Sequence, residues 1–131
     1  MIRNLFLTGL IVLFSSTASI ANSEESKEFV QFVPFHTLED VREGALLEAS
    51  EKLQEGFLSL QEGFIKRELL RDENGKWADL IYWESKEDSE NAALKVPQSD
   101  VCGHYFSLIE PFDPEDPSQG VFTFTKISNW E

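Results

Sequence analysis

Hydrophobic and polar residues alternate along five stretches of the chain, a pattern typical of half-buried β-strands. The first stretch is rich in Phe and Val, and its Pro34 indicates that this strand bends or reaches a sheet edge near its end. The last stretch alternates Thr and Phe. The sequence therefore predicts strands at residues 28–35, 64–71, 76–84, 104–109 and 121–128.

Apolar residues recur every three or four positions between the first two strands, which predicts a helix of about six turns. Thr37 opens a weak form of the capping box at its start. A second helix is predicted from Ser85, with Asp88 three positions further on, and it ends before Pro97. The apolar positions of the first helix are Leu38, Val41, Ala45, Ala49, Leu53, Phe57 and Leu60.

A tight turn joins the second and third predicted strands. Asp72-Glu-Asn-Gly75 supplies a type I turn with glycine where a positive φ is needed. With residues 73–75 as the loop, Asp72 faces Lys76 and Ile65 faces Trp83. Because alternate strand residues share a face, one side of the hairpin carries Ile65, Arg67, Leu69, Arg71, Trp77, Asp79, Ile81 and Trp83.

The predicted elements follow the order β-α-β-β-α-β with one further strand, which indicates the α+β class. Two helices on one face of such a sheet leave the other face bare. In a domain of this size, a bare face must meet water, a ligand or another subunit. The sequence therefore predicts one domain built on one sheet.

Four short motifs in and around the hairpin carry a family resemblance. They are Gly63-Phe64, Glu68-Leu-Leu-Arg-Asp72, Gly75-x-Trp77 and Tyr82-Trp-Glu-Ser85. Together with the element order, they resemble the antibiotic biosynthesis monooxygenase-like family over residues 28–110, most strongly over 63–93. The resemblance implies a ferredoxin-like fold, here with an extra C-terminal strand, whose sheets pack face to face in a homodimeric α/β barrel. It also implies a cavity in each subunit between the bare sheet face and the helices or loops.

The family contains cofactor-free monooxygenases, haem-degrading enzymes and members of unknown role, so the resemblance does not select an activity. Its haem-degrading members supply an axial His and a Trp from the second helix. Residues 87–96 contain neither, which argues against haem degradation. No cofactor motif or phosphate-binding loop is evident, and no cofactor is expected.

The tryptophan-bearing face of the hairpin has two interpretations. In a ligand pocket, Trp77 and Trp83 are aromatic walls for a planar apolar compound. Arg67 or Arg71, paired with Asp79, then orients that compound. In a dimer interface, the same residues are aromatic packing and a satisfied ion pair. The two interpretations are compatible, since the family's pocket borders its interface.

Other candidates are aromatic or titratable residues near these strands. Tyr82 and Tyr105 are hydroxyl donors for a phenolic or quinone-like ligand, or else core and interface residues. Phe106 is a further pocket wall. His104 or Asp79 is the candidate base, with a surface or capping role as the alternative for the histidine. With two His and one Cys in the chain, no metal-ligand spacing is present, and no metal site is expected.

Residues 1–21 have the pattern of a secretory signal peptide. Arg3 is followed by an apolar run at 5–14 and by small residues at Ser19 and Ala21. The run is short for a membrane span, and a retained N-terminal anchor is the alternative interpretation. Residues 22–131 are then expected to form one exported domain, periplasmic or secreted. Its core is expected at 27–110, followed by a C-terminal extension at 111–131.

The chain is acidic, with a net charge of −13. Removal of residues 1–21, which hold one basic and no acidic residue, makes the net charge −14. Such a surface repels phosphates and argues against nucleic acid or an anionic membrane as a partner of the mature chain. Cys102 is the only cysteine, so a buried thiol is expected, with an intermolecular disulfide as the alternative.

Two functional hypotheses remain. In the first, the protein is a cofactor-independent monooxygenase in which an aromatic or quinol-type molecule is deprotonated in the pocket and reacts with oxygen. In the second, it is a non-catalytic exported homodimer that binds a small ligand or serves in a stress response.

Overall fold

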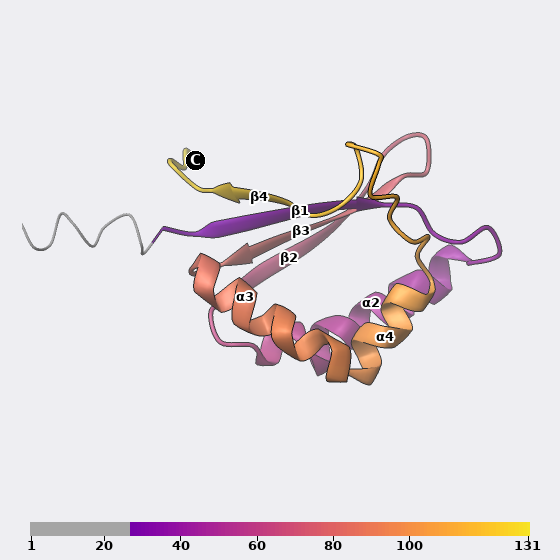
Figure 1. The fold of residues 1–131 in the computed structure, drawn as a ribbon, viewed down its shortest axis with the longest axis horizontal. Coiled ribbons are helices and arrows are strands. Elements are labelled where there is room, and N and C mark those ends of the chain that lie inside the picture. Colours follow the sequence, from indigo (N-terminus) through magenta and orange to yellow (C-terminus); the bar gives the residue numbers. More distant parts are fainter. Residues whose placement is uncertain (1–26) are drawn as a thin grey trace, which may run out of the picture.

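The computed structural model describes residues 27–131, which form a four-stranded sheet and a layer of helices (Figure 1). The predicted signal peptide and the residues up to 26 lie outside the described residues. The strands are β1 (Phe29–Phe35), β2 (Phe64–Arg71), β3 (Trp77–Trp83) and β4 (Phe122–Thr125). The helices are α2 (Glu43–Gly56), α3 (Lys86–Lys95) and α4 (Asp100–Ser107), with 3₁₀ turns at Leu58–Leu60 and Val96–Gln98.

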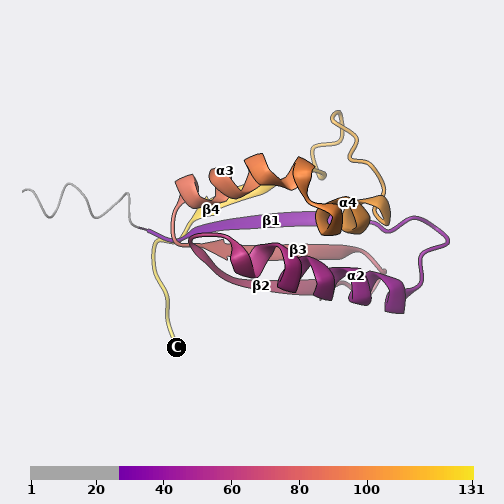
Figure 2. The same ribbon diagram turned by 90° about the horizontal axis from the view of Figure 1, so that it is seen from below.

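The sheet has the order β2-β3-β1-β4, and each neighbouring pair is antiparallel. β1 and β2, which α2 connects, are not neighbours in the sheet, because β3 lies between them. In the same way, α3 and α4 connect β3 to β4, and β1 lies between these two strands. Figure 2 shows the three helices lying across one side of the sheet. This is the ferredoxin-like α+β fold that the sequence predicts.

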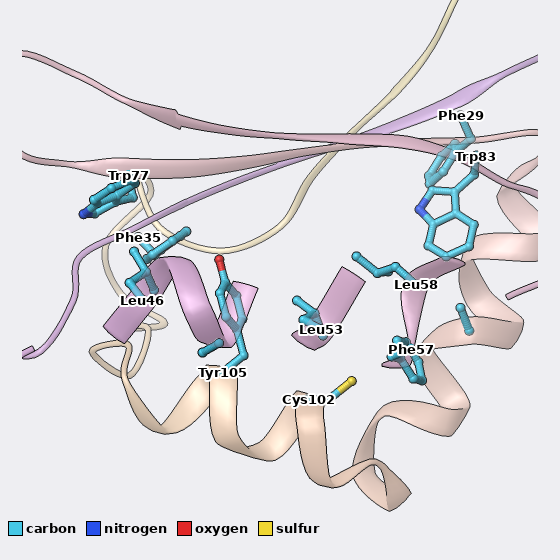
Figure 3. Close-up of a cluster of buried hydrophobic side chains, with 12 residues drawn as sticks. Phe29, Phe35, Leu46, Leu53, Phe57, Leu58, Trp77, Trp83, Cys102 and Tyr105 are labelled. Carbon is cyan, nitrogen blue, oxygen red and sulfur yellow. The ribbon is translucent and has the colours of Figure 1, made fainter. Parts of the chain in front are cut away.

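The strand register decides which side chains face the helices. Trp77, Asp79 and Trp83 share one face because alternate strand residues point the same way. Trp77 and Trp83 are buried in the same cluster as residues of α2 and α4 (Figure 3). The chain's own helices therefore cover this face, and its interpretation as a dimer interface is wrong. The other members of the cluster are Phe29, Phe35, Leu46, Ala49, Leu53, Phe57, Leu58, Ala92, Cys102 and Tyr105.

The first helix is shorter at its start than the sequence predicts. α2 begins at Glu43 rather than after Thr37. Thr37 instead forms an isolated β-bridge with Ile109, and the Leu38 N–H donates to the Leu108 carbonyl at 2.9 Å. This pairing with the segment after α4 satisfies the Leu38 N–H and the His36 carbonyl outside the helix.

The predicted strand at residues 104–109 is wrong, because most of this segment belongs to α4. Ser99 caps that helix, since its hydroxyl accepts a hydrogen bond from the Cys102 N–H at 3.3 Å. Cys102 and Tyr105 lie three positions apart on one helix face and are buried together. β4, which pairs with β1, is consequently the fourth strand of the sheet rather than an extra one.

The predicted register of the hairpin is confirmed along most of its length, with Arg67 opposite Ile81. A β-bulge after Phe64 shifts the pairing at the far end. Phe64, rather than Ile65, therefore lies opposite Trp83, and its ring contacts the indole edge-on.

Ser85 starts α3, as the sequence predicts. Its hydroxyl accepts a hydrogen bond from the Asp88 N–H at 3.1 Å and donates to Asp88 Oδ2 at 2.9 Å. Gly63 lies against this cap with a φ of +78°, and a Cβ there would come within 2.0 Å of Asp88 Oδ2. The close approach and the positive φ both require glycine where β2 begins.

Candidate functional site

Arg67, Asp79 and Tyr105 form a hydrogen-bonded group between the sheet and α4, here called the polar cluster. Arg67 Nε donates to Asp79 Oδ1 at 2.8 Å, and the Tyr105 hydroxyl donates to Asp79 Oδ2 at 2.9 Å. The side chains of Arg67 and Asp79 are 4% and 8% exposed. The ion pair agrees with the predicted hairpin register, whereas Tyr105 reaches it from a helix that the sequence does not predict.

Burial has the largest effect on protonation in the polar cluster. It raises the pKa of Asp79 above its ordinary value, against the opposing effects of the Arg67 charge and of the hydrogen bonds from Arg67 and Tyr105. Burial and the nearby Asp79 carboxylate also raise the pKa of the Tyr105 hydroxyl. Asp79 is thus a stronger proton acceptor than an exposed carboxylate, while Tyr105 keeps its proton and donates.

The Arg67 guanidinium is not fully satisfied within the described part of the chain. Nη1 donates to the Ser50 carbonyl at 3.3 Å, and Cζ lies 5.2 Å from the centroid of the Tyr105 ring. Nη2 is buried and has no hydrogen-bond partner among the described residues. A buried polar group without a partner is costly, and more so on a charged side chain. The polar cluster therefore contains one buried donor group without a hydrogen-bond partner.

A cavity of about 150 Å³, here called the sheet–helix cavity, is lined by sequence and strand neighbours of the polar cluster but by none of its three residues. Ile81, directly opposite Arg67 in the sheet, lines it, as does Val33, which lies opposite Asp79. Cys102, one helical turn before the tyrosine of the cluster, lines it from α4. The rest of the wall is Gln31, Leu53, Phe57, Leu58, Trp83, Ser89, Ala92, Ala93, Val96, Phe106 and Val121.

The wall of the sheet–helix cavity is mostly apolar, and several of its polar groups are engaged. Trp83 Nε1 donates to Gln31 Oε1 at 2.7 Å, and the Ser89 hydroxyl donates to the Lys86 carbonyl at 2.7 Å. Burial raises the pKa of the Cys102 thiol, which keeps it protonated at neutral pH. An apolar cavity of about this volume accommodates a single benzene-sized ring.

Some of the predicted site residues meet at this place. Asp79 and Arg67 form the polar cluster with the tyrosine of α4. Trp83 and Phe106 line the sheet–helix cavity, from β3 and α4 respectively. In Figure 3, Trp83 lies beyond Leu53 and Cys102 as seen from Tyr105. Two of the predicted site residues thus belong to the polar cluster, and two others line the sheet–helix cavity.

Other predicted site residues lie elsewhere. Arg71 Cζ is 5.2 Å from the Trp77 ring centroid, and Arg71 Nη1 donates to Glu43 at 2.8 Å near the surface. Tyr82 points to the opposite face of the sheet. His104 is exposed on α4, whereas the residue after it is buried and bonded to the carboxylate. Of the two candidate bases, Asp79 belongs to the polar cluster and His104 does not.

The sequence pattern does not place three residues of this site. It marks Tyr105 as a hydroxyl donor without a location, and it does not assign Gln31 or Cys102 to the pocket. The available signal is Ser99 three residues before Cys102, which is the spacing of a helix cap. A helix from that cap places Cys102 and Tyr105 on one face.

The face of the sheet opposite the helices is mostly apolar and is not covered by the described helices (Figure 1), and we call it the open face. A concavity of about 560 Å³ lies on it, partly lined by Phe32, Phe122 and Phe124. Phe124 and Leu70 are 56% and 42% exposed. The register places on this face Val30, Phe32, Pro34, Lys66, Glu68, Leu70, Ala78, Leu80, Tyr82, Phe122 and Phe124.

Two kinds of feature are absent from residues 27–131. No helix in this range is long and apolar enough to cross a membrane. No group of three or more His, Cys, Asp and Glu side chains in the same range is placed to hold a metal ion.

Comparison with known proteins places the fold but not the reaction. No protein-family model matches the sequence, and no curated protein matches it. Among solved structures, SnoaB, a cofactor-independent oxygenase from Streptomyces nogalater, is 13% identical with a TM-score of 0.62, covering 79% of this chain and 96% of its own. A Bordetella bronchiseptica protein assigned as an antibiotic biosynthesis monooxygenase is 10% identical with a TM-score of 0.61, covering 78% and 99%.

A different activity occurs on the same fold. Hydroxynitrile lyase from Passiflora edulis is 11% identical with a TM-score of 0.56, covering 81% of this chain and 99% of its own. These likenesses show that the chain has the fold of the antibiotic biosynthesis monooxygenase-like proteins, as the sequence motifs predict. Since the fold supports more than one reaction, the activity must be argued from the site.

Proposed function

We propose that the protein is a cofactor-independent oxygenase acting on a small aromatic molecule of the quinol type. The observation that supports this most is the polar cluster together with an apolar, ring-sized cavity that its neighbours line, in a fold shared with a cofactor-independent oxygenase. The substrate ring would lie in the sheet–helix cavity with Trp83 and Phe106 as walls. Asp79, whose pKa burial raises, would accept a phenolic proton from it.

The reaction balances without an added reductant. Hydroquinone and O₂ give hydroxybenzoquinone and water: one oxygen atom replaces a ring hydrogen, and the other leaves as water. Oxidation of the quinol supplies two electrons and hydroxylation of the ring supplies two more, which together reduce O₂. Deprotonation makes the ring electron-rich enough to react with oxygen, so the protein must supply a base, an orientation and a dry enclosure.

Oxygen uptake tests this proposal with a panel of hydroquinones and other polyphenols. We expect uptake above the spontaneous rate, with kcat reduced about 100-fold or more in Asp79→Asn, because a positioned base contributes at least that factor. His104→Ala is the matched control and should retain wild-type kcat, since His104 is exposed. Equal loss in both variants, or no uptake with any substrate, would contradict the assignment.

The second candidate is ligand binding without turnover. One observation favours it: no Asp, Glu, His, Lys or Arg is among the described residues that line the sheet–helix cavity. On this hypothesis, the polar cluster stabilises the fold and takes no part in a reaction. A ligand-induced rise in melting temperature without oxygen uptake would support binding and exclude the oxygenase.

We also propose that the open face joins two copies of the chain, which would bury the exposed Phe124 and the concavity beside it. The wild-type protein should sediment as a dimer at micromolar concentration, and Leu80→Lys, on the open face, should sediment as a monomer. Leu60→Lys, at a position 73% exposed in the 3₁₀ turn after α2, is the control and should remain dimeric. A monomeric wild-type protein would refute this assembly.

The protein is further proposed to act after export. The support is the basic, apolar and small-residue pattern of residues 1–21 and the acidity of residues 22–131. The intact mass of the exported protein should match a chain that begins at Asn22. A mass that includes the first 21 residues would contradict cleavage and favour the retained anchor.

A further inference from the structure

Gln31 lines the sheet–helix cavity with an amide group that is only half engaged. The residue lies on β1 and forms part of the cavity wall on the sheet side. Trp83 Nε1 donates to Gln31 Oε1 at 2.7 Å. Because an indole N–H can only donate, the amide oxygen must be the atom that faces the indole. This bond therefore identifies Nε2, with its two N–H groups, as the other end of the amide.

Nε2 of Gln31 is a donor that a ligand can reach. It has no hydrogen-bond partner among residues 27–131, and it is not one of the fully buried unpaired atoms of this range, whereas Nη2 of Arg67 is. The backbone of Gln31 pairs on both sides, with Ile81 of β3 and with Thr123 of β4. The two neighbouring strands and the bond to Trp83 thus hold the amide in place before a ligand arrives.

The wall of the cavity differs between its two sides. Leu53 and Cys102 are buried on the inner side, whereas Phe106 and Val121 are exposed where the cavity opens. Val121 immediately precedes β4, the edge strand that pairs with β1 at Gln31. The free donor therefore lies on the strand next to the open side of the cavity, and the inner side offers apolar contacts for a ring.

We propose that Nε2 of Gln31 donates to a carbonyl oxygen on the ring of the ligand, so that the cavity selects aryl aldehydes, ketones or quinones over rings of the same shape without an acceptor. This inference rests on the proposed use of the sheet–helix cavity for a ring, but on neither turnover nor the polar cluster. It goes beyond a quinol, because a carbonyl oxygen is a stronger acceptor than a phenol oxygen, whose lone pair is partly delocalised into the ring.

The donor is neutral, and this also limits the ligand. No Asp, Glu, His, Lys or Arg is among the described residues that line the cavity. An ionised substituent would therefore be buried there without a counter-ion, which is costly. Benzoate should accordingly bind far more weakly than benzaldehyde, although both carry a carbonyl oxygen.

The test compares the binding of benzaldehyde and styrene, which differ in C=O against C=CH₂, by calorimetry on the wild-type protein and on Gln31→Glu. Glutamate keeps an oxygen for Trp83 Nε1 but replaces the NH₂ group by a second oxygen, which is ionised at pH 8 and cannot donate. In Gln31→Glu we expect benzaldehyde to bind about 10- to 100-fold more weakly, with styrene binding unchanged. Each ligand is compared with itself, so its cost of leaving water cancels.

Gln54→Glu is the matched control, since it makes the same substitution at a half-buried glutamine of α2 that does not line the cavity. It should bind both molecules as the wild type does. Infrared spectroscopy of the wild type needs no variant: hydrogen bonding should lower the C=O stretching frequency of bound benzaldehyde below its value in a hydrocarbon solvent.

Three results would overturn the role of Gln31. They are equal weakening of benzaldehyde and styrene in Gln31→Glu, an unchanged benzaldehyde affinity in that variant, and an unshifted C=O band in the wild type. Failure of the wild type to bind either molecule would instead refute the proposed use of the cavity, and this inference with it.

Discussion

Arg67→Met should lower the free energy of unfolding by about 3–5 kcal/mol at pH 7, because it leaves the buried Asp79 carboxylate without its cation. Asp79→Asn also leaves a buried charge without its counter-ion, that of Arg67, so it too should be destabilising. It should cost less than Arg67→Met, because the amide oxygen of asparagine can accept the hydrogen bond that Arg67 Nε donates to Asp79. Burial already raises the pKa of Asp79, so folding disfavours the charged form of this side chain, and asparagine carries no charge. Chemical denaturation of both variants measures this asymmetry.

We also expect the free energy of unfolding to depend on pH through Asp79, and the direction of this dependence can be stated. The pKa of Asp79 is higher in the folded than in the unfolded chain, so the folded state binds the extra proton between these two values. The contribution of Asp79 to stability is therefore largest below its ordinary pKa, and it falls as the pH rises to the folded value. The wild type should lose stability relative to Asp79→Asn over this window, and Arg67→Met should lose more. Equal losses for both variants at pH 7, or the opposite slope, would contradict this account of the cluster.

Phe57→Ala should lower the free energy of unfolding by about 3–5 kcal/mol, since Phe57 is 6% exposed and forms part of the cavity wall. Removing the ring would also enlarge the sheet–helix cavity. An aromatic ligand should therefore raise the melting temperature of this variant more than that of the wild type. Calorimetric melting with and without hydroquinone measures both effects.

Leu60→Ala is the control for this substitution, because Leu60 is in the adjoining 3₁₀ turn and 73% exposed. It should change stability by no more than about 0.5 kcal/mol and leave the ligand effect as it is in the wild type. A loss below about 1 kcal/mol in Phe57→Ala would show that the ring does not support the wall. Ligand stabilisation no greater than in the wild type would show that the ligand binds elsewhere.

The sequence predicts the parts of this fold that local chemistry determines. The Asp72–Gly75 turn fixes the hairpin, and the hairpin register brings Arg67 to the side of Asp79. The cap at Ser85 starts α3 as predicted. Each of these features depends on residues close together in the chain, and the pattern there is unambiguous.

The errors occur where tertiary contacts or an ambiguous pattern decide the outcome. Thr37 carries a capping signal, but its pairing with Ile109 is a contact between distant segments that periodicity cannot reveal. In residues 104–109, a short alternation favours a strand, whereas the spacing of Cys102 and Tyr105 fits a helix. The strand interpretation removes Tyr105 from the predicted site and makes β4 an extra strand. It also hides which face of the sheet the helices cover.

The most direct test is a crystal structure of the protein with hydroquinone bound. We expect the ring in the sheet–helix cavity against Trp83. A ring bound only in the concavity of the open face, or a sheet–helix cavity without ligand at saturating hydroquinone, would contradict the proposed site.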